Sequence, residues 1–214
     1  MKRLFHTSSL VLGLALVVAG PSVASGEENA AEGTGSIKGT VSASGVRSPE
    51  NVLVYIEKAP GEYPPPKEPA EEDQVKLKFI PFVLPIVKGT TVKFLNSDPL
   101  LHNVFWPKGK GYSGRNLGTW GKGASKKIKF DKLGEVVLLC NIHSEMEGHI
   151  VVLQNPFFAV VDKEGTYEIK NVPPGDYKVK TWYSKPKKLR SKSAKVTVKA
   201  GGATELDFSL SRRR

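Results

Sequence analysis

Cysteine, methionine and histidine are scarce in this chain, and the scarcity limits what the chain can be. Its 214 residues include one cysteine, two methionines and four histidines. Exported proteins that rely on disulfides carry cysteines in pairs, so a single cysteine excludes a disulfide framework. Side chains this rare are informative through their positions.

Long apolar runs are also missing, since no stretch approaches the roughly 20 residues of a membrane-spanning helix. The run LVLGLALVVAG covers only residues 10–20 and follows a positively charged start. Small residues after it place Ser22 and Ala24 at the −3 and −1 positions of a cleavage site. This pattern predicts a signal peptide over residues 1–24 and a flexible acidic leader at 25–35. We therefore expect a secreted or periplasmic protein with no transmembrane segment.

Helical periodicity is absent as well. The mature chain shows no ten-residue helical pattern, and its 21 glycines and 15 prolines favour turns and short strands. Alternating apolar and polar residues predict an all-β fold with sandwich-like spacing. The expected strands lie at 36–43, 51–57, in two or three segments of 75–98, at 101–107, 126–131, 134–140 and 148–155, and in five short segments between 157 and 210.

Two segments are expected to lack regular structure. Residues 58–73 contain five prolines, which predicts a linker. Residues 108–125 are rich in glycine and predict a surface loop. Within that loop GKGYSG matches the G-x-G-x-x-G pattern, but no helix follows it, so nucleotide binding is not expected.

The scarce side chains gather around one short stretch of the mature chain. CNIHSEM, residues 140–146, contains Cys140, His143 and Met146. A free thiol is a liability in an oxidising compartment, and metal ligation would protect it. One thiolate, two imidazoles and a weak axial thioether form the ligand set of a mononuclear electron-transfer copper. We interpret the stretch as three such ligands, with His102 supplied from another strand end.

Two other interpretations of these residues stay open. Zinc binds cysteine and histidine well, although methionine is a poor zinc ligand. A buried free cysteine beside a core histidine and methionine can also be simple packing. The remaining histidine, His149, follows Gly148 at the start of an expected strand, and we expect it at the surface or at a sheet edge.

Two motifs resemble those of the cupredoxins. NSDPLLHNVFW, residues 96–106, is preceded by VKGTTVKFL and followed later by CNIHSEM. The Cys-x-x-His-x-x-Met spacing is that of the amicyanin-like members, and the resemblance covers about residues 73–154. It implies a Greek-key β-sandwich that holds one copper ion, which cycles between Cu(I) and Cu(II).

The resemblance also implies roles for individual residues. It makes His102, Cys140, His143 and Met146 the copper ligands. Asn103 would tie the two ligand loops together by hydrogen bonds, as partners of metal ligands often do. The ligand loop departs from the amicyanin-like pattern by carrying Ser144, Glu145 and Glu147 in place of bulkier and less acidic residues.

The last part of the chain resembles a different family. DKEGTYEIKNVPPGDYKV, residues 162–179, is similar to the carboxypeptidase-regulatory or transthyretin-like β-sandwich. In that fold an early strand pair comes directly before such a run, and here the matching pair lies at 36–57. We therefore expect residues 36–60 and 156–211 to form one small sandwich with the cupredoxin domain inserted in it. The alternative is two consecutive domains, with 36–57 belonging to the first.

Positive charge is concentrated at the end of the chain. The formal net charge is +11, and residues 178–214 hold twelve lysines and arginines against Glu205 and Asp207. This segment is either a solvated surface or a docking site for an acidic partner or an anionic envelope surface. Nucleic acid is not an expected partner of an exported protein.

These inferences predict a secreted copper protein that carries single electrons between redox partners, which the sequence does not identify. It is not expected to be an enzyme, because its histidines are too few for a multicopper oxidase. Two alternatives stay open: a copper-binding or copper-handling protein without electron transfer, and a surface binding module with a vestigial metal site.

Overall fold

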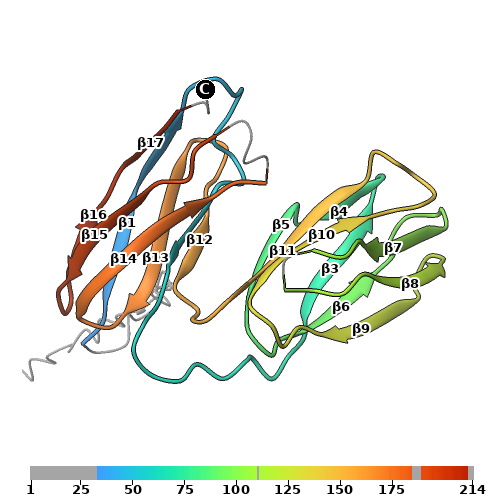
Figure 1. Cartoon of the computed structure of the whole chain (residues 1–214), viewed down its shortest axis with the longest axis horizontal. Coiled ribbons are helices and arrows are strands. Elements are labelled where there is room, and N and C mark those ends of the chain that lie inside the picture. The colour runs from blue at the N-terminus through green and yellow to red at the C-terminus, as the bar shows by residue number, and fades with distance from the viewer. Residues whose placement is uncertain (1–32, 110, 185–188, 212–214) are drawn as a thin grey trace, which may run out of the picture.

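The computed structural model describes residues 33–109, 111–184 and 189–211. The predicted signal peptide, most of the predicted leader and parts of the basic C-terminal segment lie outside the described residues. Within those ranges the chain is all-β, with seventeen strands in four sheets and no helix, which confirms the predicted fold class (Figure 1). The described residues therefore include no helix that could cross a membrane.

The four sheets pack in pairs as two β-sandwiches, which lie side by side in Figure 1. We call them the terminal sandwich and the central sandwich, after their positions in the sequence. The terminal sandwich contains β1 (Gly35–Ala43), β2 (Leu53–Ile56), β12 (Phe158–Val160), β13 (Thr166–Val172), β14 (Gly175–Trp182), β15 (Ser193–Val198), β16 (Ala203–Glu205) and β17 (Phe208–Leu210). The central sandwich contains β3 (Ala70–Val75), β4 (Lys78–Ile80), β5 (Val83–Val87), β6 (Thr91–Leu95), β7 (His102–Trp106), β8 (Arg115–Trp120), β9 (Ser125–Lys129), β10 (Gly134–Leu139) and β11 (Glu147–Leu153).

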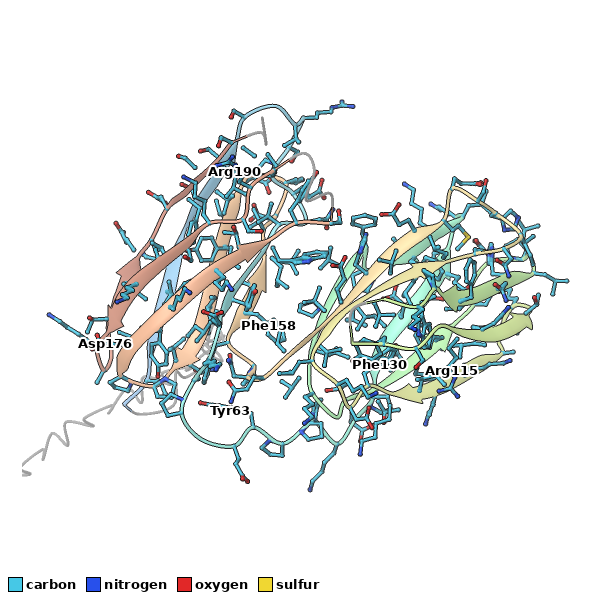
Figure 2. All side chains as sticks on the ribbon, in the orientation of Figure 1. Tyr63, Arg115, Phe130, Phe158, Asp176 and Arg190 are labelled. Atoms are coloured by element: carbon cyan, nitrogen blue, oxygen red, sulfur yellow. The ribbon has the colours of Figure 1, made fainter. Side chains whose placement is uncertain are left out.

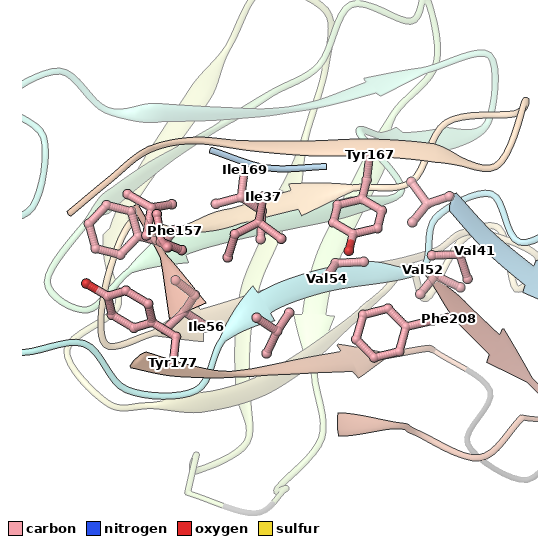
Figure 3. Packing of buried hydrophobic residues seen from close by; sticks show 14 of the residues in the cluster. Ile37, Val41, Val52, Val54, Ile56, Phe157, Tyr167, Ile169, Tyr177 and Phe208 are labelled. Atoms are coloured by element: carbon pink, nitrogen blue, oxygen red, sulfur yellow. The ribbon is translucent and has the colours of Figure 1, made fainter. Parts of the chain in front are cut away.

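The terminal sandwich joins strands from the two ends of the described chain. One sheet has the order β13-β1-β16, with β17 also paired to β1, and the other has the order β12-β2-β14-β15. Successive side chains of a strand point to opposite faces of its sheet, so each sheet directs one row of apolar side chains into the space between the two sheets. Ile37 of β1, Ile169 of β13 and Val54 of β2 thus meet in one core, together with the aromatic rings of Tyr167 and Phe208 (Figure 3).

The central sandwich has a second, separate core. Its sheets have the orders β5-β11-β10-β7-β8 and β4-β3-β6-β9. Phe94 of β6, Trp106 of β7 and Leu138 of β10 are buried between them. The sheet that contains β7, β10 and β11 positions the candidate metal centre.

A third apolar cluster lies where the two sandwiches meet. Leu53 comes from the terminal sandwich, whereas Val83, Val151 and Leu153 come from the central one. Phe158, labelled in Figure 2, packs against this cluster from the terminal side. The strand β11 is buried on both faces, since its other residues point into the central core. Such a strand reads as a near-continuous apolar run, as HIVVL does here.

Two predicted irregular segments contain strands. β3 begins at Ala70, inside the predicted linker 58–73, because the last proline of that linker is Pro69 and the chain beyond it can pair with β6. β8 lies inside the predicted loop 108–125. It pairs antiparallel with β7 across a register shift, and Gly118, with φ of +80°, lies in the shifted part of the ladder. The glycines that suggested a loop instead allow an irregular strand.

The core of the central sandwich contains a carboxyl group that has no hydrogen-bond partner in the part of the chain that the structure describes. Glu72 of β3 is fully buried, and neither of its carboxyl oxygens has a hydrogen-bond partner among the described residues. Burial raises the pKa of Glu72 well above its ordinary value of 4.5, and the neighbouring charge of Asp73 adds to the effect. The folded protein therefore retains a proton on Glu72 at pH values where the unfolded chain has released it.

This proton makes stability depend on pH. Between the unfolded and folded pKa values of Glu72 the folded state binds one more proton, so the free energy of unfolding falls as pH rises, by about 1.4 kcal/mol per pH unit. Glu72→Gln removes the ionisable group, and we expect the pH profile of the metal-free variant to lose this slope. Urea unfolding at a series of pH values measures it, with the exposed Glu71→Gln as control. Parallel profiles for the parent and Glu72→Gln would contradict the prediction.

Candidate metal centre

One hairpin loop carries three of the predicted ligands. Strands β10 and β11 pair antiparallel up to Leu139 and Glu147, so residues 140–146 form the loop between them. The backbone N–H of Met146 donates to the carbonyl of His143 at 3.1 Å, which tightens the turn. Cys140 is 4% exposed and Met146 1% exposed, and both belong to the central core cluster. His143 is half-buried.

The fourth predicted ligand comes from the neighbouring strand. His102 is the first residue of β7, which pairs with β10 at Leu139 and Phe105, and it is completely buried. Its Nδ1 lies 3.0 Å from Nδ1 of His143. The ligand atoms of His102, Cys140 and His143 all lie within 4.8 Å of one another, so this group can hold a metal ion. Met146 is buried in the same core cluster as Cys140, and its role as a ligand stays a prediction.

Asp98 contacts the imidazole of His102 on the side away from His143. Its Oδ2 lies 2.8 Å from Nε2 of His102, and an ionised carboxylate can only accept a hydrogen bond. In the neutral imidazole the hydrogen therefore sits on Nε2, which leaves Nδ1 as the lone-pair nitrogen on the side of His143. A carboxylate in this position also fixes the orientation of the ring.

Asp98 is itself held by a strained turn. Lys76 and Leu77 connect β3 and β4 with φ values of 51° and 60°, a conformation uncommon for residues other than glycine, asparagine and aspartate. Their backbone N–H groups donate to Oδ1 and Oδ2 of Asp98 at 2.6 and 2.9 Å. Burial acts to raise the pKa of Asp98, but these two N–H groups and His102 outweigh it and hold the pKa below its ordinary value. Asp98 therefore stays ionised and joins the turn to the candidate ligand.

Asn103 connects the two ligand-bearing segments. Its backbone N–H donates to Sγ of Cys140 at 3.4 Å, and its Oδ1 accepts the backbone N–H of Asn141 at the same distance. Its Nδ2 donates to Oδ1 of Asn116 and to the carbonyl of Gly118, both in β8. These hydrogen bonds fix the position of Sγ relative to the strand that carries His102.

The prediction that His149 lies at the surface or at an edge is wrong. The side chain is 2% exposed. Its Nε2 lies 2.9 Å from a carboxylate oxygen of Glu147, and its ring packs edge-on against Phe82 and Trp182. Trp182 belongs to the terminal sandwich, so both sandwiches contribute to the burial of His149. The only local signal was the apolar character of the positions on the same face, Val151 among them.

The sequence interpretation also missed Asp98. It lies four residues before His102 in the motif NSDPLLH, and its spacing does not by itself show that the chain folds back on the imidazole. In the structure the bend that carries Asp98 is closed by Asn96. This side chain is buried, and its amide group donates a hydrogen bond to the carbonyl of Leu100 at 2.9 Å.

No family model and no curated protein matches the sequence. A Cu-containing nitrite reductase (NirK) from Thermus scotoductus SA-01 is 33% identical over 40% of this chain, with a TM-score of 0.38, and this chain covers only 22% of that enzyme.

Amicyanin structures are similar over a comparable part of the chain. The oxidised state of one amicyanin variant is 26% identical over 39% of this chain and 81% of its own, with a TM-score of 0.37. The reduced Cu(I) form of another variant is 24% identical over 46% of this chain and 97% of its own, with a TM-score of 0.38.

Proposed function

We propose that this protein is an exported mononuclear copper protein that transfers single electrons between redox partners. The observation that carries the proposal is the convergence of one thiol and two imidazoles from two separate segments, within 4.8 Å of one another. The hydrogen bond from Nε2 of His102 to Asp98 leaves Nδ1 as the lone-pair nitrogen on the side of His143. Packing alone gives no reason for such an arrangement.

The donor set fits copper better than zinc. His102, Cys140 and His143 would hold the ion, with Met146 as a weak fourth ligand. Soft sulfur donors favour Cu(I) and imidazoles suit both oxidation states, whereas thioethers are rare on zinc. A bound copper ion would accept and release one electron by cycling between Cu(II) and Cu(I). The rigid strands around Cys140 and His102 keep the ligands in place during that cycle, and this keeps reorganisation small.

The partner would approach where the site is nearest to solvent. His143 is only half-buried, and three large apolar side chains beside the ligands, Leu100, Leu101 and Ile142, are exposed. Exposed apolar residues gathered in one place commonly mark a contact surface. We propose that this surface docks the redox partners, and that the protein is a carrier rather than an enzyme.

The domain organisation supports a further part of the proposal. β1 pairs with β13, β16 and β17, and β2 pairs with β12 and β14. We propose that residues 73–154 form a cupredoxin domain inserted in a carboxypeptidase-regulatory-like sandwich made of 36–60 and 156–211. The basic segment 178–214 would dock an acidic partner or an anionic envelope surface, since Lys178 and Lys195 lie opposite each other on adjacent strands.

Spectroscopy and voltammetry test the function directly. The mature protein, residues 25–214, is loaded with Cu(II), and we expect an intense blue thiolate-to-copper band, narrow copper hyperfine splitting in EPR and a reversible one-electron couple. A colourless copper complex would reject the proposal in favour of zinc or packing. A blue complex without a reversible couple would favour copper handling without electron transfer.

A further inference from the structure

The face of β11 that looks toward the terminal sandwich carries His149. Val151 and Leu153 point the same way, because alternate residues of a strand share a face, and both belong to the cluster between the sandwiches. His149 lies between two carboxylates. Its Nε2 is 2.9 Å from Oε1 of Glu147, and its Nδ1 is 3.3 Å from Oε1 of Glu135 on β10. Within the described residues Nδ1 makes no hydrogen bond, so the imidazole is bonded to Glu147 on its own strand and only lies close to Glu135 on β10.

The terminal sandwich completes the surroundings of this imidazole through Trp182. The indole ring packs edge-on against His149, with centroids 5.4 Å apart, and its Nε1 donates to Oε2 of Glu135 at 3.4 Å. Trp182 is the last residue of β14 and lies opposite Leu53, which is buried in the cluster between the sandwiches. Its position is thus set by the terminal sandwich.

The other end of this chain of contacts reaches the ligand loop. Glu147 follows Met146 directly and pairs with Leu139, so it is the residue at which the loop rejoins the sheet. Gly148 has no room for a side chain, since an added Cβ would lie 2.7 Å from Cβ of Phe79. Phe79 and Met146 belong to the same core. The backbone after Met146 is therefore held from the core side by Phe79 and from the opposite side by His149.

We infer that the terminal sandwich is part of the support of the metal centre: Trp182 positions His149, which holds Glu147 and so fixes the end of the ligand loop at Met146. Trp182 and His149 are positioning residues that would not touch the metal. The inference rests on the proposed copper function for its effect on the metal, whereas its effect on the loop concerns the metal-free chain.

Hydrogen exchange of the metal-free protein tests the support itself. Trp182→Ala removes the ring contact and the hydrogen bond to Glu135, and we expect exchange of the amides at residues 146–149 to become at least about tenfold faster. Trp182→Phe keeps an aromatic ring against His149 and should remain close to the parent. Tyr183→Ala, which alters the neighbouring aromatic residue packed on the other core, should leave these amides unchanged.

Copper release supplies the second readout. Outer partners of metal ligands typically contribute 10- to 100-fold to affinity, so we expect a Cu(I) chelator to strip Trp182→Ala about tenfold faster than Tyr183→Ala. A folded Trp182→Ala protein with parental exchange at 146–149 would overturn the inference. Parental exchange cannot be confused with failure of the copper proposal, because the exchange experiment contains no copper.

A second variant covers the case in which Trp182→Ala does not fold. His149→Phe keeps a ring between Phe82 and Trp182 but removes the contact with Glu147. We expect its circular dichroism spectrum to match the parent, while exchange at residues 146 and 147 accelerates. A folded His149→Phe protein with unchanged exchange at these two amides would equally overturn the inference.

Discussion

Replacing Cys140 with serine is expected to abolish the intense visible band of the copper-loaded protein. The band requires a thiolate bonded to copper, and a serine hydroxyl is neither soft nor ionised near neutral pH. Copper affinity should fall by more than the roughly 10- to 100-fold that follows loss of an outer partner, since a ligand itself is lost. Absorption and EPR spectra, with a chelator competition for affinity, measure both effects.

The fold should survive this substitution. Serine is slightly smaller than cysteine, and its oxygen can accept the backbone N–H of Asn103 that now points at Sγ. We expect the metal-free Cys140→Ser protein to lose about 1 kcal/mol of unfolding free energy, which is typical of a single buried substitution. Ser144→Ala, in the exposed part of the same loop, is the control and should keep the band. A blue band that persists without Cys140 would place the metal elsewhere.

The ligand loop could be predicted from sequence because its geometry is local. Cys140, His143 and Met146 fall between two strands whose alternation was visible, so a single hairpin had to present them together. The rarity of these residue types in the chain made the spacing stand out. The structure brings His102 into contact with His143, and this meeting depends on the pairing of β7 with β10. The resemblance to the cupredoxins led us to expect His102 beside the loop residues, but the strand pairing itself was not predicted.

Features that depend on distant parts of the chain could not be predicted. His149 is buried, and one of the two rings packed on it, Trp182, comes from the other sandwich, a contact that no pattern near His149 encodes. β8 was hidden by Gly118 and by the glycines on either side of the strand, since its strand conformation comes from hydrogen bonds to β7 and not from the propensity of its own residues. The alternation along β3 places Glu72 on the inward face of the strand. Buried polar groups are normally hydrogen-bonded, however, and neither carboxyl oxygen of Glu72 has a partner among the described residues, so its burial could not be predicted.

Removing the Asp98 carboxylate is expected to have the largest effect on stability. Asp98→Ala leaves two backbone N–H groups of the β3–β4 turn and Nε2 of His102 without their acceptor. Each hydrogen bond to a charged group is worth about 1.5–3 kcal/mol. Lys76 and Leu77 have positive φ, and the variant removes the hydrogen bonds to Asp98 that offset the strain of this backbone conformation. We expect a loss of roughly 3 kcal/mol or more in the unfolding free energy of the metal-free protein, measured by urea denaturation.

Asp98→Asn separates the role of the charge from that of the acceptors. The amide can offer one oxygen to Leu77 and His102, but its NH2 group then faces the N–H of Lys76, so one donor stays unpaired. Stability should lie between the parent and Asp98→Ala, and the exposed Asp131→Ala should change it by less than about 0.5 kcal/mol. With copper bound, both Asp98 variants should show a shifted reduction potential, because the imidazole of His102 loses the charged hydrogen-bond partner that orients it. An unchanged potential together with lost stability would mean that Asp98 supports the turn alone and leaves the electronic character of His102 untouched.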